Sequence, residues 1–105
     1  MASGMRYSPK WTQKPTMNEA ADGKNLLIEC RLTSDSEPQI AWLVNDAQVQ
    51  DGGRYKLVFK KESGNAYYAS LNVSDTQKKS NTTKYEVKTR NDAGESSATV
   101  NSFLG

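Results

Sequence analysis

Residues 85–94 read Tyr85-Glu86-Val87-Lys88-Thr89-Arg90-Asn91-Asp92-Ala93-Gly94, which is a strand pattern followed directly by a turn. Tyr85 and Val87 alternate with charged residues, and such alternation places one face of a strand in the interior and the other in water. The run Asn91-Asp92-Ala93-Gly94 then supplies residues that are typical of turns. We therefore predict a half-buried antiparallel strand, Lys84–Asn91, that ends in a turn.

The same two-residue period recurs along most of the chain, and no segment offers ten residues with a helical period. Short strands at this spacing, separated by turn residues, predict an all-β fold, either a two-sheet sandwich or a small barrel. The polar stretch Asp75–Thr83 is the longest predicted loop. The predicted strands are Lys10–Lys14 and Thr16–Ala21 (one strand broken at Pro15), Lys24–Thr33, Gln39–Asn45, Arg54–Glu62, Ala66–Ser74, Lys84–Asn91 and Glu95–Phe103, with a further short strand near Gln48–Val49.

Length and charge bound the class of protein. A chain of 105 residues is one domain, and we place it at residues 6–104, after a tail of residues 1–5 whose Met1-Ala2-Ser3-Gly4 we interpret as a cloning remnant. The 14 basic and 12 acidic residues are interleaved, unlike the one-sided basic stripe of a nucleic-acid-binding protein. The longest apolar run, Ile40–Val44, has five residues, whereas a membrane span needs about 20. We expect neither a nucleic-acid nor a membrane partner.

The chemical inventory argues against catalysis. The chain has no histidine, so Cys-His and Ser-His-Asp arrangements are impossible within it. The single cysteine, Cys30, excludes an intramolecular disulfide and points to a reducing compartment. We therefore predict that the chain is no enzyme and has no catalytic residue, cofactor, metal site or disulfide, and that Cys30 is an inert buried thiol.

Five short motifs, in order, resemble the intermediate set of immunoglobulin domains. Cys30 and Trp42, twelve residues apart, are similar to the family's strand-B cysteine and strand-C tryptophan, and residues 85–94 resemble its Y-x-C-x-A-x-N-x-x-G signature. The other three matches are Gly53-Arg54-Tyr55 at the fourth strand, Leu71-Asn72-Val73 for L-x-I, and Pro9–Pro15 for the P-x-F-x-x-x-P opening of muscle members. The resemblance spans residue 9 to about residue 104 and implies a two-sheet Greek-key sandwich.

The chain departs from the family pattern at three places. Val87 stands where the second disulfide cysteine would be, as in many intracellular members of the family. The aspartate that usually pairs with the strand-D arginine is absent from residues 81–85, so a salt bridge from Arg54 is in doubt. Ser102 stands where the last strand normally carries an apolar residue.

The resemblance also implies residue roles. Cys30, Trp42, Leu71, Tyr85 and Val87 are expected to form the structural core, with the Tyr85 hydroxyl bonded to backbone within Asp75–Thr83. Trp11 and Tyr68 are candidate interface residues. Tyr67 and Tyr68 cannot both point inward on one strand, and exposed tyrosines often mark interfaces.

The implied function is that of a structural, non-enzymatic module of a giant sarcomeric or cytoskeletal protein of the titin, twitchin and obscurin type. Such a module is a mechanical spacer and a docking unit, located in the cytoplasm and monomeric when isolated. Its expected partners are neighbouring immunoglobulin or fibronectin-type domains of the same chain, together with sarcomeric proteins. One alternative is an extracellular adhesion or receptor domain, which the two N-glycosylation sequons Asn72-Val73-Ser74 and Asn81-Thr82-Thr83 favour. The other is an immunoglobulin domain that flanks a muscle kinase.

Overall fold

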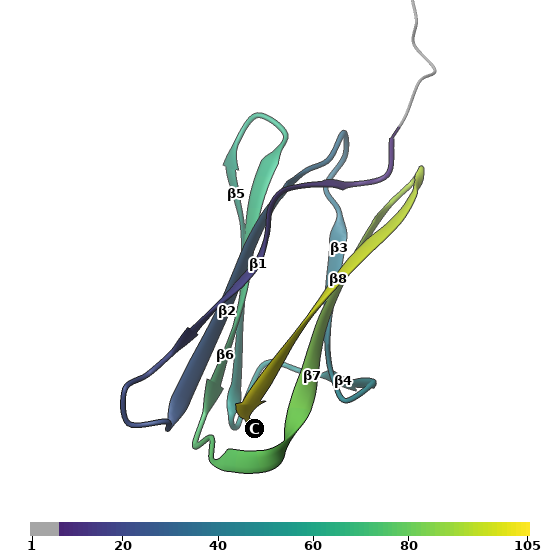
Figure 1. Cartoon of the computed structure of the whole chain (residues 1–105). Helices are drawn as coiled ribbons and strands as arrows, with labels where there is room; N and C mark the ends of the chain where they lie inside the picture. Colours follow the sequence, from purple (N-terminus) through teal and green to yellow (C-terminus); the bar gives the residue numbers. More distant parts are fainter. Residues whose placement is uncertain (1–6) are drawn as a thin grey trace, which may run out of the picture.

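The computed structural model describes residues 7–105, which form eight β-strands and no helix (Figure 1). The tail predicted at residues 1–5 and the predicted domain start at residue 6 lie outside the described residues. The strands are β1 (Lys10–Glu19), β2 (Asn25–Thr33), β3 (Gln39–Val44), β4 (Ala47–Val49), β5 (Tyr55–Ser63), β6 (Ala66–Ser74), β7 (Lys78–Asn91) and β8 (Gly94–Leu104).

The strands form two four-stranded antiparallel sheets. One has the order β1-β2-β6-β5 and the other the order β4-β3-β7-β8, so the chain changes sheet after β2, β4 and β6. Figure 1 shows the two layers face to face, with the start of β1 near one end of the molecule and the end of β8 near the other. The predicted all-β, two-sheet sandwich is confirmed.

The core lies between the sheets and follows the two-residue period of the sequence. Trp42 of β3 is the register partner of Val87 of β7, and both are almost completely buried. From the facing sheet, alternate residues of β2 and β6 fill the space against them, because successive side chains of a strand point to opposite faces. The buried cluster comprises Leu26, Ile28, Cys30, Trp42, Ala69, Leu71, Val73, Tyr85 and Val87.

The turn between β3 and β4 fixes the end of β3 one residue earlier than predicted. Asn45 and Asp46 have φ values of 49° and 70°, which is the left-handed geometry of a two-residue hairpin turn. Asn45 belongs to this turn and not to the strand. Its backbone N–H donates to the Lys84 carbonyl at 2.8 Å, and its side-chain Oδ1 accepts from the Lys84 N–H at 2.9 Å. The turn is thereby held against β7.

The prediction of a loop over Asp75–Thr83 is wrong beyond Gln77, because β7 begins at Lys78. Gln77 and Gly105 exchange two backbone hydrogen bonds of 2.9 and 3.0 Å, and Lys78 pairs with Leu104 of β8. The register shifts between Lys78 and Thr83, so the polar residues there form an irregular extension of the ladder. The end of β8 orders this segment, which carries no apolar pattern of its own.

The first strand is continuous through Pro15, although its register with β2 shifts between Trp11 and Gln13 and again between Gln13 and Thr16. Proline has no N–H to donate, and the irregularity next to it accommodates that loss at the sheet edge. Among the described strands, β1 forms its ladder with β2 alone. Contacts of the N-terminal segment with β8 include side-chain hydrogen bonds, from Ser96 to the Pro9 carbonyl and from Ser102 to Glu19.

Candidate interaction sites

The residues expected to form the core all lie in one buried cluster. Cys30, Leu71 and Val87 are fully buried, and Trp42 and Tyr85 expose only 1% of their surface. Cys30 is a free thiol whose Sγ donates to the Ala69 carbonyl at 3.6 Å. Burial raises the pKa of this thiol from its usual 9.0 to about 12. Since the thiolate is the reactive form, the site disfavours nucleophilic or redox chemistry at neutral pH.

The prediction that the Tyr85 hydroxyl bonds to backbone within Asp75–Thr83 is wrong. The hydroxyl donates to the Leu104 carbonyl at 2.7 Å. Lys78 and Thr83 of the segment expected to receive it pair with the end of β8, and this end supplies the Leu104 carbonyl as the acceptor. Burial raises the pKa of Tyr85, in keeping with a hydroxyl that stays protonated as a donor. The bond joins β7 to Leu104, the last residue of β8.

Among residues 7–105, Arg54 has no carboxylate partner, and its guanidinium donates to backbone carbonyls instead. Its Nε donates to the Ser74 carbonyl at 3.0 Å and one Nη donates to the Asp75 carbonyl at 3.2 Å. Asp75 has a φ of 54°, so Arg54 stabilises a left-handed position at the end of β6. Hydrogen bonds thus replace the family's usual salt bridge.

Ser102 is 3% exposed, and its hydroxyl is fully engaged. It donates to Glu19 at 2.8 Å and accepts from the Leu104 N–H at 2.9 Å. A buried polar group costs little when its hydrogen bonds are made, which explains why serine is accepted at an apolar position.

The two candidate interface residues lie on opposite faces of the β1-β2-β6-β5 sheet. Trp11 is half-buried and packs against the core, and its Nε1 is buried without an acceptor. Tyr68 lies on the outer face, with the cations of Arg31 and Lys60 at 5.0 and 5.2 Å from its ring centre. Its hydroxyl donates to Glu29 at 2.6 Å. Tyr68 therefore presents a ring held in a charged surface network.

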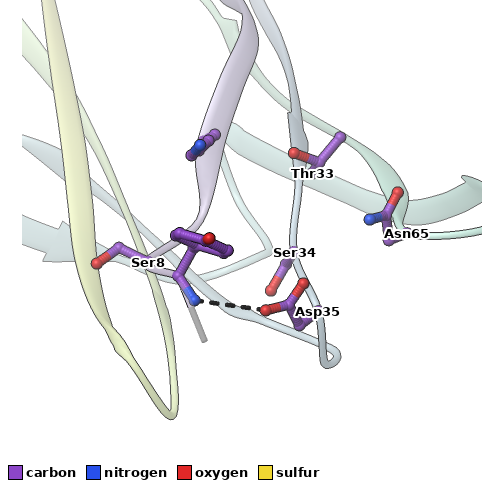
Figure 2. A pocket seen from close by; sticks show the side chains of 7 residues that line it. Ser8, Thr33, Ser34, Asp35 and Asn65 are labelled. Atoms are coloured by element: carbon purple, nitrogen blue, oxygen red, sulfur yellow. Dashed lines mark hydrogen bonds between the residues drawn. The ribbon is translucent and has the colours of Figure 1, made fainter. Parts of the chain in front are cut away.

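A polar pocket lies where the described chain begins (Figure 2). Ser8, Thr33, Ser34, Asp35 and Asn65 line it, and the dashed bond in the figure joins the Tyr7 N–H to Asp35 Oδ2 at 3.4 Å. The pocket is formed by the N-terminal segment, the loop after β2 and the hairpin between β5 and β6.

Asn91 organises this end of the molecule, whereas the sequence predicted only that it belongs to a turn. Its Nδ2 donates to the Tyr7 carbonyl at 2.8 Å and to the Ser34 hydroxyl at 3.0 Å. Its Oδ1 accepts from the N–H groups of Ala93 and Gly94 at 2.8 and 3.2 Å. One amide thus holds the β7–β8 turn and the N-terminal segment together. The available signal was the asparagine three residues before Gly94 at the end of a strand.

Within residues 7–105, no group of three or more His, Cys, Asp or Glu side chains is placed to hold a metal ion. Over the same residues, no helix is long and apolar enough to cross a membrane.

Comparison with known proteins places the whole sandwich in one family. Residues 9–102 match the immunoglobulin I-set domain family. The chain belongs to this family. The I-set match includes the core of Cys30, Trp42 and Val87, and domains of this family are generally non-catalytic.

The curated relatives of this I-set domain include giant proteins. A titin homolog of Caenorhabditis elegans is 38% identical over 52 residues, or 49% of the chain, and titin of Drosophila melanogaster is 30% identical over 87 residues, or 83% of the chain. The Drosophila irregular chiasm C-roughest protein is 29% identical over 69 residues, or 64% of the chain. The matched stretch amounts to 0%, 0% and 9% of the length of these relatives, to the nearest percent.

Solved structures share the fold. An I-band fragment of titin superposes with a TM-score of 0.73 at 24% identity, covering 92% of this chain and 32% of the fragment. The twitchin kinase region of C. elegans gives 0.69 at 22% identity, covering 89% of this chain and 16% of that one. At these identities the likeness shows the fold alone.

Proposed function

We propose that this I-set domain is a structural, non-enzymatic module of a giant sarcomeric or cytoskeletal protein, where it serves as a mechanical spacer and a docking unit. The observation that carries the proposal is the sequence likeness to two titins, which extends over 83% of the chain for the Drosophila protein. Its partners are then neighbouring immunoglobulin or fibronectin-type domains and proteins of the sarcomere, and its location is the cytoplasm. The isolated domain is expected to be a monomer.

The arrangement of the terminal strands supports a mechanical role. β1 enters at one end of an elongated molecule, about 54 Å long, and β8 leaves at the other (Figure 1). A pull on the two ends acts along both strands, so the hydrogen bonds of the β1–β2 and β7–β8 ladders are loaded in shear and must break together. β1 and β8 do not pair with one another along their described residues. Each end of the chain instead pulls on its own sheet.

The hydrogen bonds of Asn91 to the Tyr7 carbonyl and to Ser34 support an arrangement in tandem with neighbouring domains. Three side-chain hydrogen bonds set the direction in which the chain enters the domain: Asn91 donates to the Tyr7 carbonyl, the Tyr7 N–H donates to Asp35, and Ser96 donates to the Pro9 carbonyl. A fourth bond, from Asn91 to Ser34, holds the Asn91 amide in place. A spacer whose entry direction is fixed transmits orientation from one domain to the next. Exposed Tyr7 and the polar pocket beside it would face the preceding domain.

An antibody against this domain tests the proposed location. It should label muscle in stripes that repeat with the sarcomere. Force spectroscopy on a polyprotein of the domain tests the mechanical role, and single, repeatable unfolding peaks above those of a domain pulled perpendicular to its strands are expected. Labelling confined to the cell surface, or unfolding with no resolved force peak, would count against the proposal.

Two sequons favour a second candidate, an extracellular adhesion or receptor domain. Asn81 is exposed on β7, and Asn72 is half-buried on the outer face of β6. Expression through the secretory pathway, followed by enzymatic deglycosylation, tests this role, because a fall in mass requires that a glycan was attached. The kinase-flanking alternative rests on the fold shared with the twitchin kinase region, and the sequence next to this domain in its parent protein decides it.

A further inference from the structure

The first half of β3 has an edge that no strand of the described chain covers. β4 pairs only with Trp42–Val44, so Gln39–Ala41 pair with β7 on one side and with no described strand on the other. In Figure 1, β4 lies beside only the lower end of β3. An uncovered edge presents backbone N–H and C=O groups that another strand can use.

This edge lacks the features that protect sheet edges in natural proteins. β5, which flanks the same opening on the facing sheet, carries three lysines, and β1 at the far edge carries Pro15. Gln39–Ala41 contain neither a charge nor a proline. Gln39–Ala41, which follow Glu37 and Pro38, are therefore a short stretch of edge with no protecting residue of their own.

Two hollows flank this stretch of β3, one on each side. The first is a cleft between the sheets with a mainly apolar lining, formed by Pro38, Ile40, Trp42, Leu57, Val58 and Phe59 together with the polar Glu37 and Gln39. Phe59 is 38% exposed at its mouth and stacks on Tyr67 with a ring separation of 5.5 Å. The second hollow is polar and lies on the outer side, where Gln48, Lys88, Arg90 and Glu95 line it beside Ala41.

The outer hollow carries an excess of positive charge. Neither Lys88 nor Arg90 has a carboxylate within ion-pair distance among the described residues, and Glu95, the register partner of Arg90, is the one acidic residue in the lining. One Nη of Arg90 donates to Gln39 Oε1 at 2.8 Å, which holds the guanidinium next to the open edge. A carboxylate at this place would meet two cations.

We propose that an extended, acidic segment of a partner protein adds to the sheet as a strand beside Gln39–Ala41. Because side chains of a strand alternate, its apolar residues enter the cleft between the sheets while its intervening carboxylates meet Lys88 and Arg90. The expected ligand is thus a short segment in which apolar and acidic residues alternate. This inference rests on the docking part of the proposed function and is independent of the mechanical part.

NMR titration of the ¹⁵N-labelled domain tests the proposal. The probe is a blocked peptide in which three valines alternate with glutamates, and the two controls are a peptide with the same residues in blocks and one with lysine in place of glutamate. The amides of Gln39–Ala41 and Phe59 should shift with the alternating acidic peptide alone, and the shifts should weaken with added salt. Absence of shifts at about 1 mM peptide, or equal shifts with either control, would overturn the proposal.

Charge variants on one strand sharpen the test. Lys88→Glu should weaken binding about threefold or more, whereas Lys79→Glu, the same change at an exposed position of β7 remote from the edge, should leave it unchanged. Equal loss in both variants would mean that binding follows net charge and not this site. Dimerisation of the free domain through the same amides, without peptide binding, would overturn the proposal in favour of a second copy as occupant. Failure of sarcomere labelling would leave all of these outcomes unaffected, so the two proposals fail separately.

Discussion

The Tyr85 hydroxyl donates its 2.7 Å hydrogen bond to the carbonyl of Leu104, nineteen residues further along the chain. The tyrosine is buried at the base of the core, and the carbonyl belongs to the end of the last strand. The bond therefore joins the sandwich interior to the segment through which a pull on the C-terminal side would act.

Tyr85→Phe should lower the free energy of unfolding by about 1–3 kcal/mol, because it leaves the Leu104 carbonyl without its buried donor. Equilibrium urea denaturation measures the change. Tyr7→Phe is the matched control, since Tyr7 is 49% exposed, and it should alter the free energy by less than about 0.5 kcal/mol. Equal midpoints for Tyr85→Phe and the unmodified domain would show that the hydroxyl bond contributes nothing.

Trp42→Ala should cost about 3–5 kcal/mol, which is a large share of the roughly 5–15 kcal/mol that stabilises a domain. Packing has to carry this load, because the domain lacks the disulfide that contributes about 2–5 kcal/mol in small secreted domains. Trp11→Ala should cost much less, since Trp11 is only half-buried at the sheet edge. Urea unfolding of both variants compares them, and a larger loss for Trp11→Ala would place the energetic centre of the core elsewhere.

Trp11→Phe should be close to neutral or slightly stabilising. The indole Nε1 of Trp11 is buried without an acceptor, so its removal relieves a desolvated donor while most of the ring contact is kept. Thermal unfolding followed by the fluorescence of Trp42 reports the change. A loss of more than about 2 kcal/mol would mean that ring volume outweighs the unpaired N–H.

The core was predictable because its physical origin is local in the sequence. Burial of one strand face imposes a period of two, and the resemblance to the immunoglobulin family singled out Cys30, Trp42, Leu71, Tyr85 and Val87 as core residues, all of which lie in the buried cluster. Strand ends were less certain where a turn needs an unusual backbone angle. Asn45 illustrates this, because its φ of 49° is set by the hairpin and not by the apolar pattern.

The features that the sequence predicted wrongly or incompletely depend on which distant backbone segment lies nearby in the fold. Residues 78–83 are polar throughout and become part of β7 because the end of β8 pairs with Lys78 and Thr83 at the two ends of this segment. For the same reason, the observed acceptor of the Tyr85 hydroxyl is the Leu104 carbonyl and not the predicted backbone of Asp75–Thr83. Asn91 looked like a turn former, and its bond to Tyr7 arises only when the N-terminal segment folds over the end of the sandwich. No pattern within a short window of sequence encodes such partners.

Cys30 should make the domain less stable in alkali. Burial raises the pKa of its thiol to about 12 in the folded state, whereas the unfolded chain titrates near 9.0, so only the unfolded state loses the proton between these values. The thiol's contribution is fully present below pH 9 and is lost as the pH rises toward 12, at about 1.4 kcal/mol per pH unit. The fall should be shallower in Cys30→Ala, as urea unfolding at pH 8 to 10.5 would show.

Thiol labelling gives an independent check on the same residue. The native domain should react slowly with a disulfide reagent and release one fast equivalent after denaturation, because the thiolate is scarce and inaccessible in the folded state. Fast labelling of the native protein would contradict the burial of Cys30.

Asn91→Asp should release the N-terminal segment while keeping the β7–β8 turn. The aspartate retains an oxygen that accepts from Ala93 and Gly94, but it cannot donate to the Tyr7 carbonyl and instead opposes that oxygen with a negative charge. Hydrogen exchange of the peptide spanning residues 7–11 should accelerate, whereas exchange at the turn should stay slow.

Asn91→Ala removes both functions and should accelerate exchange at both places. Asn101→Asp, an exposed position on β8, makes the same charge change and should affect neither. If Asn91→Asp leaves exchange at residues 7–11 unchanged, the segment is held by the bonds from Tyr7 to Asp35 and from Ser96 to Pro9, and Asn91 serves the turn alone.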